Sequence, residues 1–549
     1  MSWEEKVSEK RSQLRSKIPK EWLLEDEVLQ FLKNEKKDLN KNLDSLCSKL
    51  ENEITNSTIL KLREKLLAQE LTCFQIINAF CHRAALCHQI VNCLTEIMFQ
   101  EAFQAARELD AKRPAILPPL YGIPISLKDQ CNVEGVDTTM GYLGRAFKPK
   151  TKEEESLIVQ HLREQGAVLY VKTTVPSSMM ATDTASNTFG ITLNGLNQNF
   201  SPGGSSGGEG ALIACRGSLL GLGTDIGGSI RIPSSYHGLY GLKPTYGRVP
   251  YLRVDNSFQG RELIPSVIGP LARDLDDLRY FMSIIVNTCK PWIQDVNCVP
   301  YHFDFDRIES HKDYVVGFWY GDGVITPPPS DIRALKMCEA IVKATPGFKA
   351  VRWQPPTELH KELHDIAMKA DIADAGMEIM SEFDASGEPL IDILKLMVLG
   401  EETPTCTVNE WWTLNKKAYA AKTAYREYYN KFAPEDKVDV IVGPITLTPF
   451  RPGDMLKTTL RYVLLVNVLN FPSLNVPVTT INRKLDTLMD TTKALSSEDT
   501  MVMDYWNKLI ESDDVEGFPV SLQIMSPTYD DNIVCKFGSW LASQLAKSS

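Results

Sequence analysis

Apolar positions follow two different periods along this chain, and segments of the two kinds alternate. Residues 121–128 (YGIPISLK) and 167–172 (AVLYVK) are short apolar runs of the length of a buried strand, and residues 153–165 between them have helical spacing. The pattern returns with the strand-like residues 315–320 (VVGFWY) and the helical residues 331–342. Strands that alternate with helices in this way indicate an α/β protein with a largely parallel sheet.

The beginning of the chain has a different pattern. Residues 1–57 are rich in charge and read as amphipathic helices, interrupted at Pro19, with an apolar face that includes Leu29 and Leu32. We expect them to form a helical arm packed on a main domain of residues 58–549. A long helical period then begins at Thr58 and continues to Phe80.

That helical period continues into a group of cysteines and histidines. Cys81, His82, Cys87, His88 and Cys93 suggest a zinc site at first sight. Their intervals suit neither a Cys-x-x-Cys knuckle nor a pair of histidines one turn apart. We therefore predict core and half-buried helix positions. Elsewhere, too, the chain has no His, Cys and carboxylate pattern typical of a catalytic metal, so we expect neither a metal nor another cofactor.

The longest uncharged apolar stretch, residues 462–481, has nearly the length of a membrane span. Asn467, Asn470 and Asn475 interrupt it, together with two prolines. Unsatisfied amides are costly in lipid, so we interpret the stretch as buried strand and loop, not as a transmembrane segment.

Composition and charge restrict the functional classes. The 43% hydrophobic and 23% charged residues are typical of soluble globular proteins. The formal net charge of −11 offers no general attraction to phosphate backbones, so we do not expect nucleic acid as a partner. The first residues lack the apolar region of a signal peptide, and the 12 cysteines are irregularly spaced. We expect free thiols and a cytoplasmic location.

The segment of residues 201–250 is exceptionally rich in glycine and serine, which indicates tight turns or a close approach of the backbone to a ligand. A flexible linker is a poor explanation because apolar runs are interleaved with the glycines. A phosphate-binding loop is also unsupported, since the GxxxxGK[ST] pattern is absent. Gly203, Ser205 and Gly207 do satisfy G-x-S-x-G, the nucleophile elbow of Ser-His-Asp esterases. Such a match arises easily by chance in glycine-rich sequence. The Ser-His-Asp esterase stays as an alternative.

A fourth interpretation uses a lysine and two serines. Lys128 ends the strand-like YGIPISLKD, Ser205 lies in GGSSGGEG, and Ser229 lies in GTDIGGSIRIP, which is followed by GLKPTYGR. Together these blocks resemble the amidase signature family nearly letter for letter. The resemblance runs from about residue 58 to the end of the chain and is closest to the fungal acetamidase branch, with fatty-acid amide hydrolases as near relatives. Gly195 and Thr174 depart from residues that are frequent in the family, but neither is a catalytic position.

The resemblance implies an amidase that cleaves a carboxamide into a carboxylate and ammonia or an amine through a covalent acyl-enzyme. The implied fold is a large, mixed, mostly parallel, twisted sheet with helices on both faces. Ser229 is then the nucleophile, Lys128 the base and Ser205 the proton relay, with a cis peptide bond before Ser205. Lys128 can act as a base only if it is neutral, and burial in an apolar strand is the ordinary means of lowering the pKa of a lysine.

The residues around the three catalytic positions carry further predictions. The backbone amides of Ile226, Gly227 and Gly228, with that of Ser229, can converge on the oxyanion of the tetrahedral intermediate. Ser206, Asp225 and Arg231 are predicted to support the site, the last two as an ion pair; a purely structural ion pair or a solvated surface is the alternative. Met179 is a candidate for substrate contact, and a core position is equally compatible with the sequence.

Three partner questions stay open at this stage. The predicted ligand is a small-molecule amide, and the chain leaves a homo-oligomer open. A glutaminase-type amidotransferase subunit, which also belongs to this family, would need a stable partner chain. The long N-terminal arm and the acetamidase-like details favour the amidase interpretation.

Overall fold

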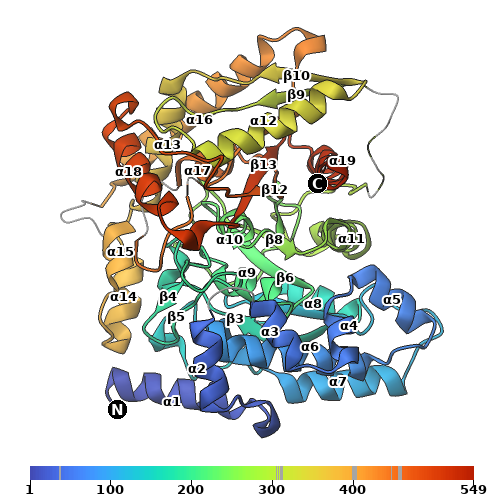
Figure 1. Ribbon diagram of the computed structural model, residues 1–549. Coiled ribbons are helices and arrows are strands. Elements are labelled where there is room, and N and C mark those ends of the chain that lie inside the picture. Colours follow the sequence, from blue (N-terminus) through green and yellow to red (C-terminus); the bar gives the residue numbers. More distant parts are fainter. Residues whose placement is uncertain are drawn as a thin grey trace.

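The computed structural model describes residues 1–35, 39–304, 306, 308, 313–397, 405–446, 448–454 and 460–548, and Figure 1 shows their arrangement. A single 11-stranded sheet runs through the molecule, in the order β1-β3-β2-β6-β8-β7-β12-β13-β11-β9-β10. The strands are β1 (Leu94–Ile97), β2 (Pro124–Lys128), β3 (Val168–Thr173), β6 (Leu220–Asp225), β7 (Tyr240–Lys243), β8 (Val267–Ala272), β9 (Tyr314–Phe318), β10 (Phe348–Arg352), β11 (Val440–Pro444), β12 (Ser473–Thr480) and β13 (Pro519–Met525). A separate small hairpin pairs β4 (Ala185–Ser186) with β5 (Gly190–Ile191).

Parallel pairing occurs in two runs of strands. One run is β3-β2-β6 and the other is β11-β9-β10. Between them, β8, β7, β12 and β13 pair in antiparallel fashion. The predicted α/β fold with a large mixed sheet is confirmed, and parallel pairing dominates toward its two ends. The first run is the one that positions the site, because β2 and β6 are parallel neighbours.

Helices cover both sides of this sheet. They are α1 (Trp3–Ser16), α2 (Asp26–Asn34), α3 (Leu39–Ser45), α4 (Lys49–Thr55), α5 (Ile59–Leu67), α6 (Cys73–Val91), α7 (Phe99–Ala111), α8 (Leu157–Glu164), α9 (Gly207–Ala214), α10 (Arg231–Tyr236), α11 (Leu275–Ser283), α12 (Pro329–Ala344), α13 (Thr357–Asp371), α14 (Met377–Ser386), α15 (Asp392–Met397), α16 (Val408–Asn430), α17 (Arg461–Val468), α18 (Ser497–Ile510) and α19 (Asp531–Ser548). Helices α12 and α19 both pack against β12 and β13, from either side (Figure 1). Helices α9 and α10 pack on each other; α9 contacts β2 and β6, and α10 contacts β7 and β12.

The predicted strand-helix-strand unit around Lys128 is present. Residues 121–128 contain β2, residues 167–172 lie within β3 apart from Ala167, and α8 lies between the two strands. All five residues of β2 are buried, as expected for a strand covered on both faces.

Two predictions about secondary structure are wrong. The long helix expected from Thr58 is two helices, α5 and α6, because the chain turns at Gln69, whose φ is 58°, and restarts at the Thr72 cap with Gln75 three residues on. The stretch of residues 462–481, expected as strand and loop, begins in helix α17 and only then enters β12. Its asparagines face buried polar partners, which periodicity alone does not reveal.

The first 57 residues pack on the rest of the protein. Lys10 of α1 is 2% exposed and contacts Glu96 and Asp137, the latter at 2.7 Å. Leu14 and Leu43 belong to the same hydrophobic core as the strands of the sheet. The segment therefore shares the core of the main domain.

The cysteine and histidine group lies on and just after α6, as predicted. Cys81, Cys87 and Cys93 are fully buried, the His88 ring accepts a hydrogen bond from the Leu94 amide, and His82 contacts Glu51. Within the ranges that the structure describes, no helix combines the length and the apolar composition needed to cross a bilayer.

Candidate active site

The predicted catalytic residues meet where two neighbouring parallel strands end. Lys128 is the last residue of β2, and Asp225 is the last residue of β6. Ser205 lies just before α9, and Ser229 lies in the loop between β6 and α10. The carboxyl ends of adjacent parallel strands are a common position for active sites because loops from both strands converge there.

Lys128 is held between two hydroxyl groups in a fully buried position. Its Nζ lies 2.8 Å from Ser205 Oγ and 2.7 Å from Thr224 Oγ1. Burial lowers the pKa of Lys128 to about 7, although the negative charge of Asp225 acts in the opposite direction. A lysine in this environment has a substantial neutral fraction near neutral pH, as its predicted role as a base requires.

Ser205 follows a tightly packed glycine. The peptide bond between Gly204 and Ser205 is cis, as the family resemblance implies. A Cβ atom on Gly204 would lie 2.7 Å from the carbonyl oxygen of Ala181, so a side chain cannot be accommodated there. This packing fixes the backbone that presents Ser205 to Lys128.

Ser229 has an accessible hydroxyl group in a largely buried loop. The residue is 7% exposed, and no described residue forms a hydrogen bond with its Oγ. The backbone amides of Ile226, Gly227 and Ser229 have no hydrogen-bond partner among the described residues. Gly228 has a φ of 98°, and its amide donates to Asp225 Oδ1 at 2.8 Å. Three of the four predicted oxyanion donors are therefore free, whereas that of Gly228 is used to hold the loop.

Asp225 and Arg231 form a buried clamp on this loop. The guanidinium donates to both carboxylate oxygens of Asp225 at 3.0 Å, so the predicted ion pair is present and bidentate. The same guanidinium donates to Asn467 Oδ1 at 2.7 Å and to Gln523 Oε1 at 2.9 Å. Burial would raise the pKa of the Asp225 carboxyl, but Arg231 and Asn467 hold it well below its ordinary value. The clamp therefore stays charged near neutral pH.

Ser206 connects the two serine-bearing segments. Its amide donates to the carbonyl oxygen of Ser229 at 3.2 Å, and its hydroxyl accepts from the Thr224 amide at 3.4 Å. The first contact reaches the loop of Ser229, and the second reaches the residue whose side chain contacts Lys128. The supporting role of Ser206 stays a prediction.

The structure adds three polar residues that sequence reasoning missed. Thr224 contacts Lys128 directly, Gln130 contacts Thr224, and Glu209 is a fully buried carboxyl group on α9. Burial raises the pKa of Glu209 to about 7, against the effect of hydrogen bonds from Ser126 and Thr173. All three missed residues lie within or beside the motifs used for prediction. Their position in the sequence could therefore have identified them as candidates.

Two sequence-based alternatives can be compared with this geometry. The nucleophile-elbow interpretation needs a histidine beside Ser205, but the described partner of the Ser205 hydroxyl is Lys128. Met179 is 5% exposed and belongs to the main hydrophobic core, with an unusual φ of 63°. Its role in substrate contact stays a prediction.

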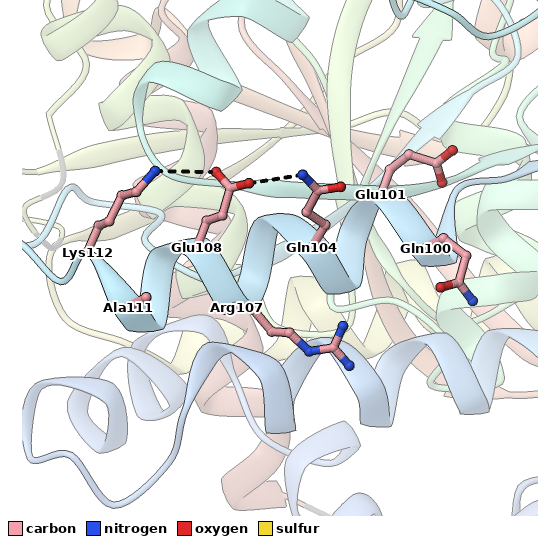
Figure 2. Close-up of a pocket in the computed structure, with 7 residues that line it drawn as sticks. All are labelled: Gln100, Glu101, Gln104, Arg107, Glu108, Ala111 and Lys112. Atoms are coloured by element: carbon pink, nitrogen blue, oxygen red, sulfur yellow. Dashed lines mark hydrogen bonds and ion pairs between the residues drawn. The ribbon is translucent and has the colours of Figure 1, made fainter.

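A surface hollow on α7 is unrelated to these residues. Figure 2 shows its lining, which comes from the solvent-facing side of that helix and the residue after it. Glu108 there contacts Gln104 at 3.0 Å and Lys112 at 3.8 Å, both as ordinary neighbours one turn apart. An exposed helix face of this kind offers no buried group for chemistry.

Comparisons with known proteins agree with this geometry. The sequence profile of the family described as Amidase matches residues 75–535. A protein from Saccharomyces cerevisiae named "Probable amidase" is 66% identical over 544 residues, which cover 99% of each chain. An "Acetamidase" from Emericella nidulans is 35% identical and covers 95% of each chain. The solved structure of a "Fatty acid amide hydrolase" has a TM-score of 0.89 at 30% identity, and the match covers 98% of this chain and 94% of that one.

Proposed function

Because this chain belongs to the amidase signature family and is an amide hydrolase, we propose that it works through Ser229, Ser205 and Lys128. An amide is a poor electrophile with a poor leaving group, so it needs an activated nucleophile, a proton for the departing nitrogen and stabilisation of the oxyanion. The observation that carries the proposal is the contact of 2.8 Å between Ser205 Oγ and Nζ of the fully buried Lys128.

In the proposed reaction, Ser229 Oγ bonds to the carbonyl carbon while its proton passes to Ser205 Oγ. Ser205 in turn passes its own proton to neutral Lys128. The carbon-nitrogen bond then breaks, and the leaving nitrogen takes a proton that returns from Lys128 through Ser205. Water attacks the acyl-enzyme by the same route, and the acid and the free Ser229 hydroxyl result.

The oxyanion of both tetrahedral intermediates is proposed to lie against the amides of Ile226, Gly227 and Ser229. These amides are free of other partners among the described residues. One such donor is typically worth about 3 to 4 kcal/mol in the transition state. The Asp225 and Arg231 clamp, which uses the Gly228 amide, would keep the three donors in place without moving during the reaction.

For the substrate, we propose small or aryl carboxamides, cleaved without a partner chain. The acetamidase of Emericella nidulans, 35% identical over 95% of this chain, supports this choice. A turnover screen of acetamide, benzamide, long-chain acyl amides and glutamine tests it directly. Ammonia release that required glutamine and a second subunit would favour the glutaminase interpretation instead.

An electrophilic phosphonate probe tests the proposed roles of the two serines. Tetrahedral phosphorus resembles the tetrahedral carbon of the intermediate, so the probe should form one adduct, at Ser229. The variant Ser229→Ala should abolish labelling, whereas Ser205→Ala should slow it without moving the adduct. Mass mapping of the adduct is the measurement. An adduct on Ser205, with Ser229→Ala still fully labelled, would overturn the assignment of the nucleophile.

A further inference from the structure

A chain of hydrogen bonds leads from Lys128 away from the two serines. Besides Ser205, Lys128 contacts Thr224 Oγ1, which lies 2.6 Å from Gln130 Oε1. Gln130 Nε2 lies 2.7 Å from the backbone carbonyl oxygen of Asp255 and 2.7 Å from the hydroxyl oxygen of Tyr251. Lys128, Gln130 and Thr224 are each at most 4% exposed. The reaction proposed above uses none of the bonds beyond Ser205.

The last partner of this chain determines the direction of every bond in it. A backbone carbonyl oxygen can only accept, so the amide of Gln130 must turn its NH2 group toward Asp255. Its Oε1 atom therefore faces Thr224 and can only accept as well. The single hydroxyl hydrogen of Thr224 must donate to Gln130, and so the Thr224 oxygen is left to accept from Lys128.

This direction matters for a neutral lysine, which has one lone pair. A Thr224 hydroxyl that could rotate would donate to this lone pair and compete with the proton of Ser205. With Gln130 in place, Thr224 accepts one N–H of Lys128 and leaves the lone pair to Ser205. We propose that Gln130 is a positioning residue for catalysis: through Thr224 it directs the lone pair of Lys128 toward Ser205. This inference rests on the proposed function, in which Lys128 is the base.

The charged groups around Lys128 are independent of Gln130. Asp225 at the end of β6 and Glu209 on α9 favour the protonated lysine, and the neighbouring Lys172 on β3 is paired with Asp129. The Cys131 thiol is also near, but burial raises its pKa to about 12 and keeps it neutral. Among the described residues, none of these side chains contacts Gln130, whose side-chain partners are Thr224 and the Tyr251 hydroxyl. Replacing Gln130 therefore changes the hydrogen-bond direction while those charges stay in place.

The sign of the pH effect follows from the acceptor strength of Thr224. A hydroxyl that donates to Gln130 is a stronger acceptor, and it stabilises protonated Lys128 more than neutral Lys128. Without Gln130, the pKa of Lys128 should fall. The acid limb of the rate profile should then move to lower pH, even though the plateau rate also falls.

The test is Gln130→Leu in the full-length protein. We expect a plateau rate about tenfold lower, part of the roughly 10²- to 10⁴-fold that general base catalysis supplies, together with the shift of the acid limb. The readouts are benzamide hydrolysis and the rate of phosphonate labelling at Ser229, each measured across pH. An unchanged labelling rate and an unchanged profile would overturn the inference.

A matched control comes from the same segment of chain. Asn132 also holds the loop of Asp255, with bonds of 3.1 Å to the Arg253 carbonyl and 2.9 Å to Asp255 Oδ1, but it has no bond to Thr224. Asn132→Ala should leave the midpoint of the acid limb in place. If it reproduced the profile of Gln130→Leu, the loop position would be the cause and the proposed direction of bonds would be wrong.

Two further variants keep the test decisive if Gln130→Leu is poorly folded. Gln130→Glu retains an acceptor for Thr224 and should keep a higher plateau rate than Gln130→Leu. In a Thr224→Val background, Gln130→Leu should cause little additional loss, because the residue through which it acts is absent. Fully additive losses would overturn the inference.

Failure of the proposed function would look different. In that case the wild-type protein would neither hydrolyse amides nor be labelled at Ser229. If labelling occurs without hydrolysis of the tested amides, the labelling rate still measures the effect of Gln130.

Discussion

At the residue scale, the environment of Lys128 determines what the site can do. Complete burial disfavours the ammonium form, and the two hydroxyl partners satisfy its hydrogen bonds without a direct carboxylate contact. A carboxylate in direct contact would instead hold the lysine protonated. The choice of hydroxyl partners is thus what allows a lysine to act as a base near neutral pH.

The first prediction concerns pH. The pKa of Lys128 is lowered to about 7, so turnover should rise as pH increases through about 7 and fall below it as the lysine becomes protonated. Lys128→Ala should reduce kcat at least about a hundredfold. A profile of kcat from about pH 5 to 9 checks the first expectation, and full activity of Lys128→Ala would remove the lysine from the mechanism.

Glu209 is the necessary control for this profile, because burial raises its pKa to the same region. In Glu209→Gln the acid limb should persist. It should lie at slightly lower pH, since one negative charge that favours protonated Lys128 has been removed. Disappearance of the limb in this variant would assign the titration to Glu209.

The second prediction concerns the Asp225 and Arg231 clamp. Asp225→Ala leaves the buried Arg231 guanidinium without its carboxylate, a change that typically costs about 3–5 kcal/mol of stability. It also frees the Gly228 amide, so the oxyanion loop should loosen and kcat should fall. Denaturant unfolding measures the first effect. The exposed Asp490, which pairs with Lys493 and caps the short helix after it, is the matched control: Asp490→Ala should leave kcat unchanged and cost much less stability.

At the element scale, helix α1 is attached to the main domain by the buried charge of Lys10, by hydrogen bonds from Arg11 to the backbone, and by apolar packing. Lys10 contacts Glu96 and Asp137, and Asp137 also accepts from Lys172 through its backbone carbonyl. Lys172 pairs in turn with Asp129, the neighbour of Lys128. Helix α1 therefore connects through Asp137, Lys172 and Asp129 to the strand that carries Lys128.

The third prediction tests this attachment. Lys10→Ala leaves the buried Asp137 carboxylate without its cation and leaves Glu96 with only the more exposed Lys17, so residues 3–16 should exchange amide hydrogens faster than in the wild type. Hydrogen exchange followed by mass spectrometry is the measurement. The exposed Arg15 on the same helix provides the control, and Arg15→Ala should leave exchange unchanged. Equal exchange in the Lys10→Ala protein and the wild type would show that apolar packing alone holds α1.

The sequence predicts an element only where the pattern of apolar residues reflects its secondary structure. The strands β2 and β3 were predictable because buried strands are short continuous apolar runs. The break between α5 and α6 was not predictable, because Gln69 adopts a left-handed conformation that is uncommon for a residue other than glycine. Similarly, α17 was missed because Asn467 looks like an interruption of the apolar pattern. In the structure its side chain contacts the buried Asp225 and Arg231.

In the candidate site, too, some residues were predictable from the sequence and others were not. Lys128, Ser205 and Ser229 were found because they lie in dense local motifs. Gln523, which contacts Arg231, lies 292 residues away from it along the chain. No local pattern contains that pairing, because it depends on how the sheet orders its strands.

At the scale of the whole molecule, the core protects nearly all of the thiols. Of the 12 cysteines, all free, Cys406 is exposed, while Cys47 and Cys289 are partly buried and the others are buried. Burial also raises the pKa of several of these thiols, which keeps them protonated and unreactive.

The fourth prediction follows from this distribution. In the native protein, one thiol should react quickly with a thiol reagent, and Cys406→Ser should remove that fast phase. After denaturation without a reductant, all 12 thiols should react. Titration with a chromogenic disulfide counts both populations. A lower number after denaturation would mean that the purified protein contains disulfides.

The contact between Arg231 and Gln523 also has a consequence for the order of events during synthesis. A ribosome releases β2, β6 and the oxyanion loop long before it releases β13, and domains tend to acquire structure from the N-terminal side onward. The Arg231 guanidinium, which holds this loop, has four partner residues. Until Gln523 has emerged, one of them is missing. A nascent chain thus carries the whole Lys128, Ser205 and Ser229 set without a finished clamp. If these residues act as proposed, we expect competence for hydrolysis only after almost all of the polypeptide has left the exit tunnel.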